Sequence, residues 1–141
     1  MKRSELREKT FIILFQHEFF PQFEEKIDFY LEREGLKEKN ADYVRRTLCG
    51  IVENIDTIDD MIRSHLINWD FDRLSKIDLS VLRLAVYEMK YSEDVPGKVA
   101  INEAIELVKK YNDHKAGVFV NGLLDRVYKN AELDEKQDEN G

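Results

Sequence analysis

Cysteine, glycine and proline are scarce in this 141-residue chain, which contains one Cys, six Gly and two Pro. A lone cysteine, Cys49, cannot form a disulfide within the chain or a thiolate metal site, and it is typical of a reducing cytoplasm. So little glycine and proline argues against a sandwich or barrel, because those folds need many tight turns. We therefore expect long helices joined by short connections.

Long apolar runs are also missing. No stretch approaches the roughly 18 consecutive apolar residues of a membrane span, and no signal-peptide core follows the basic N-terminus. We therefore expect no membrane segment and a cytoplasmic protein. Apolar residues still make up 43% of the chain, which is enough to build a packed core.

The apolar residues recur with helical spacing through most of the chain, and strand-like alternation never lasts beyond a few residues. The segments with this spacing lie at about residues 4–19, 27–31, 44–66, 79–89, 101–108 and 116–127, and residues 70–75 are predicted to form a short helix or turn. Pro21 ends the first, Gly35 caps the second, and the third reads as one long amphipathic helix. We predict an all-α fold of about seven helices, forming one compact domain over residues 1–129.

The last residues, 130–141, differ in composition from the rest of the chain. They hold one basic residue, Lys136, against five acidic ones, Glu132, Asp134, Glu135, Asp138 and Glu139. Such a charged segment with few apolar residues is typical of a solvated tail. We predict that it is disordered.

Residues for catalysis are few. His17, His65 and His114 are scattered, without a second His or Cys at metal-ligand spacing, and Cys49 lies on an apolar helical stripe. The sequence contains no glycine-rich phosphate loop and no serine nucleophile motif. We therefore expect neither an enzyme nor a bound metal or cofactor.

The N-terminus is locally basic in a chain whose formal net charge is −7. Lys2, Arg3 and Arg7 lie there, and Arg3 and Arg7 are four residues apart, so a helix would point them the same way. Such a cluster is either a solvated, frayed terminus or a surface that contacts the phosphates of a nucleic acid. Charge alone favours the first interpretation.

Two further positions could contact a nucleic acid. Lys98 follows the break at Pro96-Gly97 and lies near a predicted helix N-terminus, where anions are attracted. Phe119 lies among small and amide residues at the start of the last helix. Its ring is either part of the core, as its spacing suggests, or a platform on which a base stacks.

Several blocks of this sequence resemble the NusB family of bacterial transcription antitermination factors. The blocks are VLRLAVYEM at residues 81–89 with DVP at 94–96, KVAINEAIEL at 98–107, and FVNGLLD at 119–125. Arg7-Glu8 leading into ILFQ at 13–16 fits the family's opening. The resemblance covers about residues 3–129, although residues 20–70 match only in helical pattern.

This resemblance implies a fold of two packed helical subdomains and a function. Proteins of the family bind the boxA RNA element of ribosomal RNA leader transcripts as a heterodimer with NusE, a small-subunit ribosomal protein. They act in the transcription elongation complex with RNA polymerase, which they help to resist termination. Some occur as homodimers, so a homodimer is possible here.

The resemblance also implies roles for single residues. The positions that match RNA-binding residues of the family are Lys2, Arg3, Arg7, Lys98 and Phe119. Those that match the surface facing NusE are Phe15 and Asp78, although Asp78 is also a plausible helix cap. The chain departs from the family by having fewer arginines in its N-terminal arm, Val118 for a commonly basic residue and Gly97 for a commonly larger one.

Because the N-terminal arm has few arginines, a second hypothesis stays open. The chain would then be a helical protein–protein interaction module with little RNA affinity of its own. Binding of boxA RNA, measured alone and with NusE at two salt concentrations, distinguishes the two hypotheses.

Overall fold

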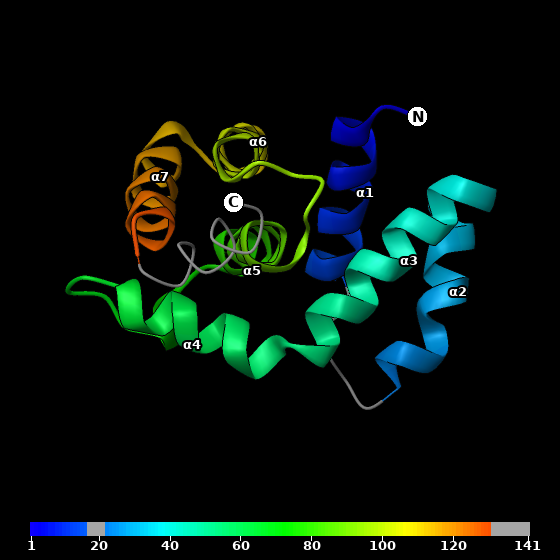
Figure 1. Cartoon of the computed structure of the whole chain (residues 1–141), viewed down its shortest axis with the longest axis horizontal. Helices are drawn as coiled ribbons and strands as arrows, with labels where there is room; N and C mark the ends of the chain where they lie inside the picture. The colour runs from blue at the N-terminus through cyan, green and yellow to red at the C-terminus, as the bar shows by residue number, and fades with distance from the viewer. Residues whose placement is uncertain (17–21, 131–141) are drawn as a thin grey trace. The chain divides into compact units, whose positions relative to one another are not determined.

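The computed structural model describes residues 1–16 and 22–130, whose backbone forms helices and no β-strand (Figure 1). The elements are α1 (Arg3–Gln16), α2 (Phe23–Arg33), α3 (Glu38–Glu53), α4 (Ile55–His65), the 3-10 helix η1 (Phe71–Arg73), α5 (Lys76–Tyr91), α6 (Gly97–Tyr111) and α7 (His114–Tyr128). The prediction of an all-α fold of about seven helices is confirmed. Residues 17–19 of the first predicted helix and 131–141 of the predicted tail lie outside the described residues.

The chain divides into two compact helical units, Met1–Asn54 and Ile55–Gly141. In the first unit, α1 and α2 each pack against α3. The core of this unit is built from apolar residues that recur along one face of each helix, with Phe11, Leu31, Leu48 and Ile51 at most 2% exposed.

Gly35 ends α2 as the sequence predicts. Its φ is +72°, a left-handed conformation that glycine adopts without strain. The amide of Gly35 donates to the carbonyl of Glu32, and the amide of Leu36 donates to that of Leu31, each at 3.0 Å. This pair of bonds is the Schellman motif, and the buried side chains of Leu31 and Leu36 provide its usual apolar contact.

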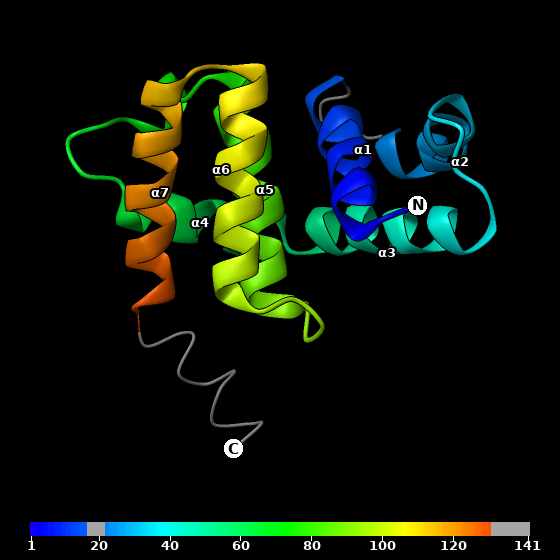
Figure 2. The ribbon, with the colours of Figure 1, turned by 90° about the horizontal axis from the view of Figure 1, so that it is seen from above.

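In the second unit, α5 packs against α4, α6 and α7. Figure 2 shows α5, α6 and α7 side by side, and α6 and α7 form a hairpin. Leu82, Val86, Leu123 and Leu124 of α5 and α7 are fully buried at the centre of this unit. A bidentate ion pair joins α5 to α4. Arg83 donates from Nε to Oδ1 of Asp59 at 2.9 Å and from Nη2 to Oδ2 of Asp59 at 2.8 Å.

The prediction of one long helix over residues 44–66 is wrong, because the helix breaks at Asn54 into α3 and α4. Asn54 leaves helical geometry with φ −115° and ψ 19°. Its side-chain Nδ2 donates to the carbonyl of Gly50 at 2.8 Å, and its amide bonds the carbonyls of Gly50 and Ile51 at 3.2 Å each. These bonds satisfy the carbonyls at the end of α3 and divide the two units at this residue.

None of the helices in the described part of the chain is long and apolar enough to cross a membrane.

Candidate functional site

The second unit contains a pocket of about 410 Å³ between the end of α4, the start of α5 and the α6–α7 connection. This volume falls in the range of small-ligand sites, roughly 300–1,000 Å³. The residues that line it are Trp69, Arg73, Leu74, Ser75, Asp78, Asn112, Asp113, Lys115, Ala116 and Phe119. The pocket therefore brings together Phe119 and Asp78, which the sequence assigned to two different binding partners.

Two aromatic rings form one side of this pocket. The ring of Phe119 is half-buried, and its centroid lies 6.1 Å from that of Trp69, with the ring planes tilted by 52°. Trp69 itself is 52% exposed, and the neighbouring Ile67 and Val118 are more than 60% exposed. Phe119 is thus not one of the buried core residues, and the two rings present an apolar surface to a ligand.

The pocket also has an acidic group, Asp78, whose side chain is buried. Its Oδ1 accepts a hydrogen bond from Nδ2 of Asn112 at 3.1 Å. Burial raises the pKa of the Asp78 carboxyl, and hydrogen bonds with Asn112 and Ser75 lower it. The negative charge of Asp113 adds to the increase in this pKa. Asp78 is therefore a carboxylate held in a fixed orientation rather than a mobile surface acid.

Asp78 is not the helix cap that the sequence allowed. Ser75 is the N-cap of α5, since its Oγ accepts a hydrogen bond from the amide of Asp78 at 3.0 Å. Asp78 lies in the first turn, where a negative charge interacts favourably with the helix dipole. The charge of Asp78 near the pocket is thus compatible with the helix that carries it.

The basic N-terminal arm belongs to the first unit. Lys2 and Arg3 are exposed at the start of α1, and the guanidinium of Arg3 lies over the ring of Tyr43 on α3, 4.3 Å from its centroid. Arg7 differs from the expectation of one exposed pair, because it is only 5% exposed. The reason is helical geometry, which places Arg7 on the same buried stripe as Thr10 and Phe11.

Phe15 and Lys98 occupy contrasting environments. Phe15, near the end of α1, is half-buried and stacks on Phe11 with centroids 6.0 Å apart. Lys98 is exposed in the first turn of α6 and makes no hydrogen bond or ion pair with another residue that the structure describes. The structure leaves both roles as predictions.

Gly97, one of the departures from the family pattern, has a packing role. A Cβ atom at this position would clash with the ring of Tyr128 at the end of α7. The glycine therefore lets the aromatic ring pack against the start of α6. With a larger residue at position 97, the ring of Tyr128 could not occupy its present place.

The histidines and Cys49 show no arrangement that is typical of a catalytic or metal site in the described residues. The Nδ1 of His65 lies 2.7 Å from the carbonyl of Met61, and its Nε2 lies 2.7 Å from Nδ2 of Asn130. His114 is exposed at the start of α7, while His17 lies outside the described residues. Burial raises the pKa of the Cys49 thiol, which makes the thiolate less available. Residues 1–16 and 22–130 contain no group of three or more potential metal ligands.

Sequence reasoning does not identify Trp69, Asn112 or Tyr43. The pairing of Trp69 with Phe119 joins residues fifty positions apart. The available signal was a polar or aromatic residue in a short connection, which is a frequent location for binding residues.

Comparison with known proteins gives consistent matches over nearly the whole chain. A sequence profile described as the NusB family matches residues 4–129. The transcription antitermination protein NusB of Clostridium perfringens is 43% identical over 135 residues, which are 94% of this chain and all of that protein.

Solved structures agree with these sequence matches. The structure of NusB from T. maritima superposes with a TM-score of 0.83 at 41% identity, covering 96% of this chain and 98% of that one. A second structure, described as antitermination factors NusB and NusE in complex with double-stranded RNA, superposes with a TM-score of 0.79 at 31% identity. It covers 90% of this chain and 96% of that chain.

Proposed function

Because the chain belongs to the NusB family of transcription antitermination proteins, we propose that it binds boxA RNA of ribosomal RNA leader transcripts together with NusE. In this role it acts in the cytoplasm, within the transcription elongation complex, and helps RNA polymerase to resist termination. The role is one of binding rather than catalysis. The observation that supports it most is the pocket of the second unit, where an aromatic platform and an oriented carboxylate lie side by side.

The RNA contacts divide into charged and aromatic ones. Lys2 just before α1, Arg3 at its first position and Lys98 on α6 are exposed cations, suited to phosphates. Phe119 offers a ring face for one unstacked base. Arg7 is only 5% exposed, and its contact with RNA stays a prediction.

The NusE contacts include Asp78 and Phe15. A ribosomal protein is expected to be basic, and an oriented carboxylate at a pocket wall favours a cation from such a partner. If this role is correct, Asp78→Lys weakens NusE binding of protein that circular dichroism shows to be folded; the melting temperature also falls, because Asp78 is buried, bonded to Asn112 and in the first turn of α5. If the variant binds NusE as before, Asp78 does not contact NusE.

One observation favours the alternative of a protein–protein interaction module. Trp69, which lines the pocket, is 52% exposed, and Ile67 and Val118, which are close in sequence to Trp69 and Phe119, are 61% and 63% exposed. Exposed apolar groups of this kind are typical of a protein interface. The module would use these groups for a protein partner and need no RNA.

Fluorescence anisotropy of labelled boxA RNA tests the proposal directly. The chain is titrated alone and with NusE, at two salt concentrations, against a scrambled RNA of the same length. The proposal expects boxA to bind more tightly than the scrambled RNA, and NusE to increase that affinity. Equal, weak affinity for both RNAs, with retained NusE binding, would support the interaction module instead. Sedimentation of the chain with and without NusE determines whether a homodimer forms.

A further inference from the structure

One face of α3 presents two cations around an aromatic ring. Lys39, Tyr43 and Arg46 are spaced i, i+4 and i+7, so they lie along one side of this helix. Lys39 and Arg46 are exposed, and Tyr43 is half-buried. Neither cation forms a hydrogen bond or ion pair with another residue in the described ranges.

The neighbouring Arg45 shows the contrast. It bonds two carboxylates, that of Asp28 on α2 at 2.7 Å and that of Asp42, which lies between Lys39 and Arg46 along α3, at 2.9 Å. Its charge is therefore already compensated within the first unit. The charges of Lys39 and Arg46 are therefore available to interact with a ligand.

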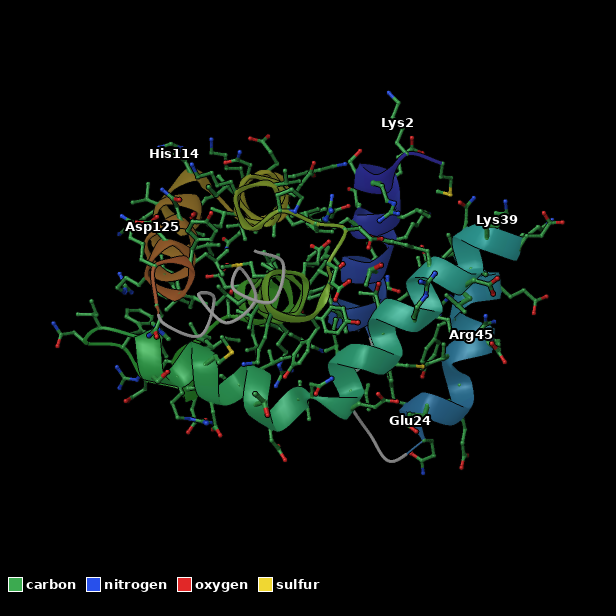
Figure 3. All side chains as sticks on the ribbon, viewed as in Figure 1. Lys2, Glu24, Lys39, Arg45, His114 and Asp125 are labelled. Atoms are coloured by element: carbon green, nitrogen blue, oxygen red, sulfur yellow. The ribbon has the colours of Figure 1, made fainter. Side chains whose placement is uncertain are left out.

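This face is continuous with the basic arm through the contact between Arg3 and Tyr43. The Arg3 guanidinium lies 4.3 Å from the centre of the Tyr43 ring, which orients it by a cation–π interaction. Figure 3 shows Lys2, at the start of α1, and Lys39, in the first turn of α3, both in the upper part of the view. The arm and the α3 face thus form one basic surface on the first unit.

The surface has the chemistry of a site for single-stranded RNA. Lys39 and Arg46 are seven positions apart, which is roughly 10 Å along the helix axis. Cations at this separation can contact two different phosphates of one strand. Between them, the guanidinium plane that Tyr43 orients is a surface on which a base can stack.

We infer that the Lys39–Tyr43–Arg46 face of α3 is a second part of the RNA-binding surface and takes the backbone of a single RNA strand. The inference rests on the proposed RNA-binding function and extends it to residues that this function does not assign. It also accounts for the lean arm, since two exposed cations on α3 add to the two on the arm, Lys2 and Arg3. Tyr43 is a positioning residue, which acts through Arg3.

The test compares two double variants of the full chain by anisotropy with labelled boxA RNA over a range of salt concentrations. The test variant is Lys39→Gln with Arg46→Gln. The matched control is Lys26→Gln with Arg33→Gln on α2, which removes the same two charges from exposed residues at the same spacing. Circular dichroism establishes that both variants are folded.

The test variant should reduce the magnitude of the log–log salt slope by about 1.4, because each single-strand phosphate contact contributes about 0.7. If the affinities converge near about 1 M salt, this change corresponds to a loss of about 25-fold at about 0.1 M. The control should retain the slope of the natural chain. A test variant that behaves like the control would overturn the inference, whereas a natural chain without salt-dependent RNA binding would overturn the proposed function itself. Loss of NusE binding with unchanged RNA binding would assign this face to a protein and also overturn the inference.

The role of Tyr43 is tested by a double-mutant cycle with Arg3. Tyr43→Leu should weaken RNA binding in the natural background and have little further effect in an Arg3→Gln background, because both changes remove the same oriented cation. Tyr43→Phe keeps the ring and should retain the affinity of the natural chain. Additive losses, or a loss in Tyr43→Phe equal to that in Tyr43→Leu, would show that Tyr43 does not act through Arg3.

Discussion

Replacing Phe119 with alanine separates a binding role of this ring from a core role. A fully buried phenylalanine costs roughly 3–5 kcal/mol of stability when it is truncated. Phe119 is only half-buried, and its contact with Trp69 at 6.1 Å is of a kind that contributes about 0.5–1.5 kcal/mol. We therefore expect Phe119→Ala to lower the free energy of unfolding by about 1–2.5 kcal/mol.

The effect on RNA binding has a different size and signature. Loss of one base–aromatic stack costs about 1–3 kcal/mol, which is a weakening of roughly 5- to 150-fold. The salt slope should stay unchanged, because the substitution removes no charge. Phe119→Ala thus lowers affinity equally at all salt concentrations.

The assay uses urea unfolding for stability and anisotropy with boxA RNA for affinity, both on the same protein preparation. Phe29→Ala is the matched control, because it makes the same substitution at a phenylalanine of α2 that is 61% exposed and lies outside the candidate site. It should change stability by less than about 0.5 kcal/mol and leave RNA affinity unchanged.

Two results would refute the reasoning about Phe119. A stability loss above about 3 kcal/mol with unchanged affinity of the folded protein would assign the ring to the core. Unchanged stability and unchanged affinity would mean that neither Trp69 nor RNA gains from the ring.

Two further predictions concern the second unit. Gly97→Ala should destabilise the chain by about 1–3 kcal/mol in urea unfolding, because its Cβ would clash with Tyr128. The control, Gly122→Ala, lies inside α7 with no close neighbour except the flexible end of an arginine, and it should stabilise the chain by about 0.5–1 kcal/mol. Equal effects of the two substitutions would disprove the clash. Burial raises the pKa of Asp78, so the folded chain holds this proton to a higher pH than the unfolded chain, and the contribution of this group to stability falls as the pH rises from about 4 through the raised pKa. Asp78→Asn should remove that fall. If the free energy of unfolding, measured at a series of pH values, changes with pH in the same way for both proteins, this prediction is contradicted.

A local signal in the sequence was sufficient to predict the end of α2. Gly35 predicted the end of α2 because the Schellman motif depends on one residue that adopts positive φ. The break at Asn54 was missed because the apolar spacing of Ile51, Ile55 and Ile58 continues across it. The deciding interaction is the side-chain bond of Asn54 to the carbonyl of Gly50, which apolar periodicity does not detect.

The candidate site was predictable only in part, because exposure and pairing arise from tertiary structure. Helical spacing aligned Arg3 with Arg7 but gave no information on which would be buried. The sequence made Asp78 a plausible cap of α5, whereas Ser75 provides the cap three residues earlier. The ring pair of Trp69 and Phe119 depends on how α7 packs near the end of α4, which local patterns do not specify.

Transcription in vitro past a terminator tests the proposed function most directly. The template carries a boxA leader upstream of the terminator, and the reaction contains RNA polymerase, NusE and the remaining elongation factors, with or without this chain. The account predicts that the chain increases the fraction of transcripts that read through the terminator, and that a mutated boxA abolishes this increase. Readthrough that does not change when the chain is added, or that increases equally on the template with mutated boxA, would contradict it.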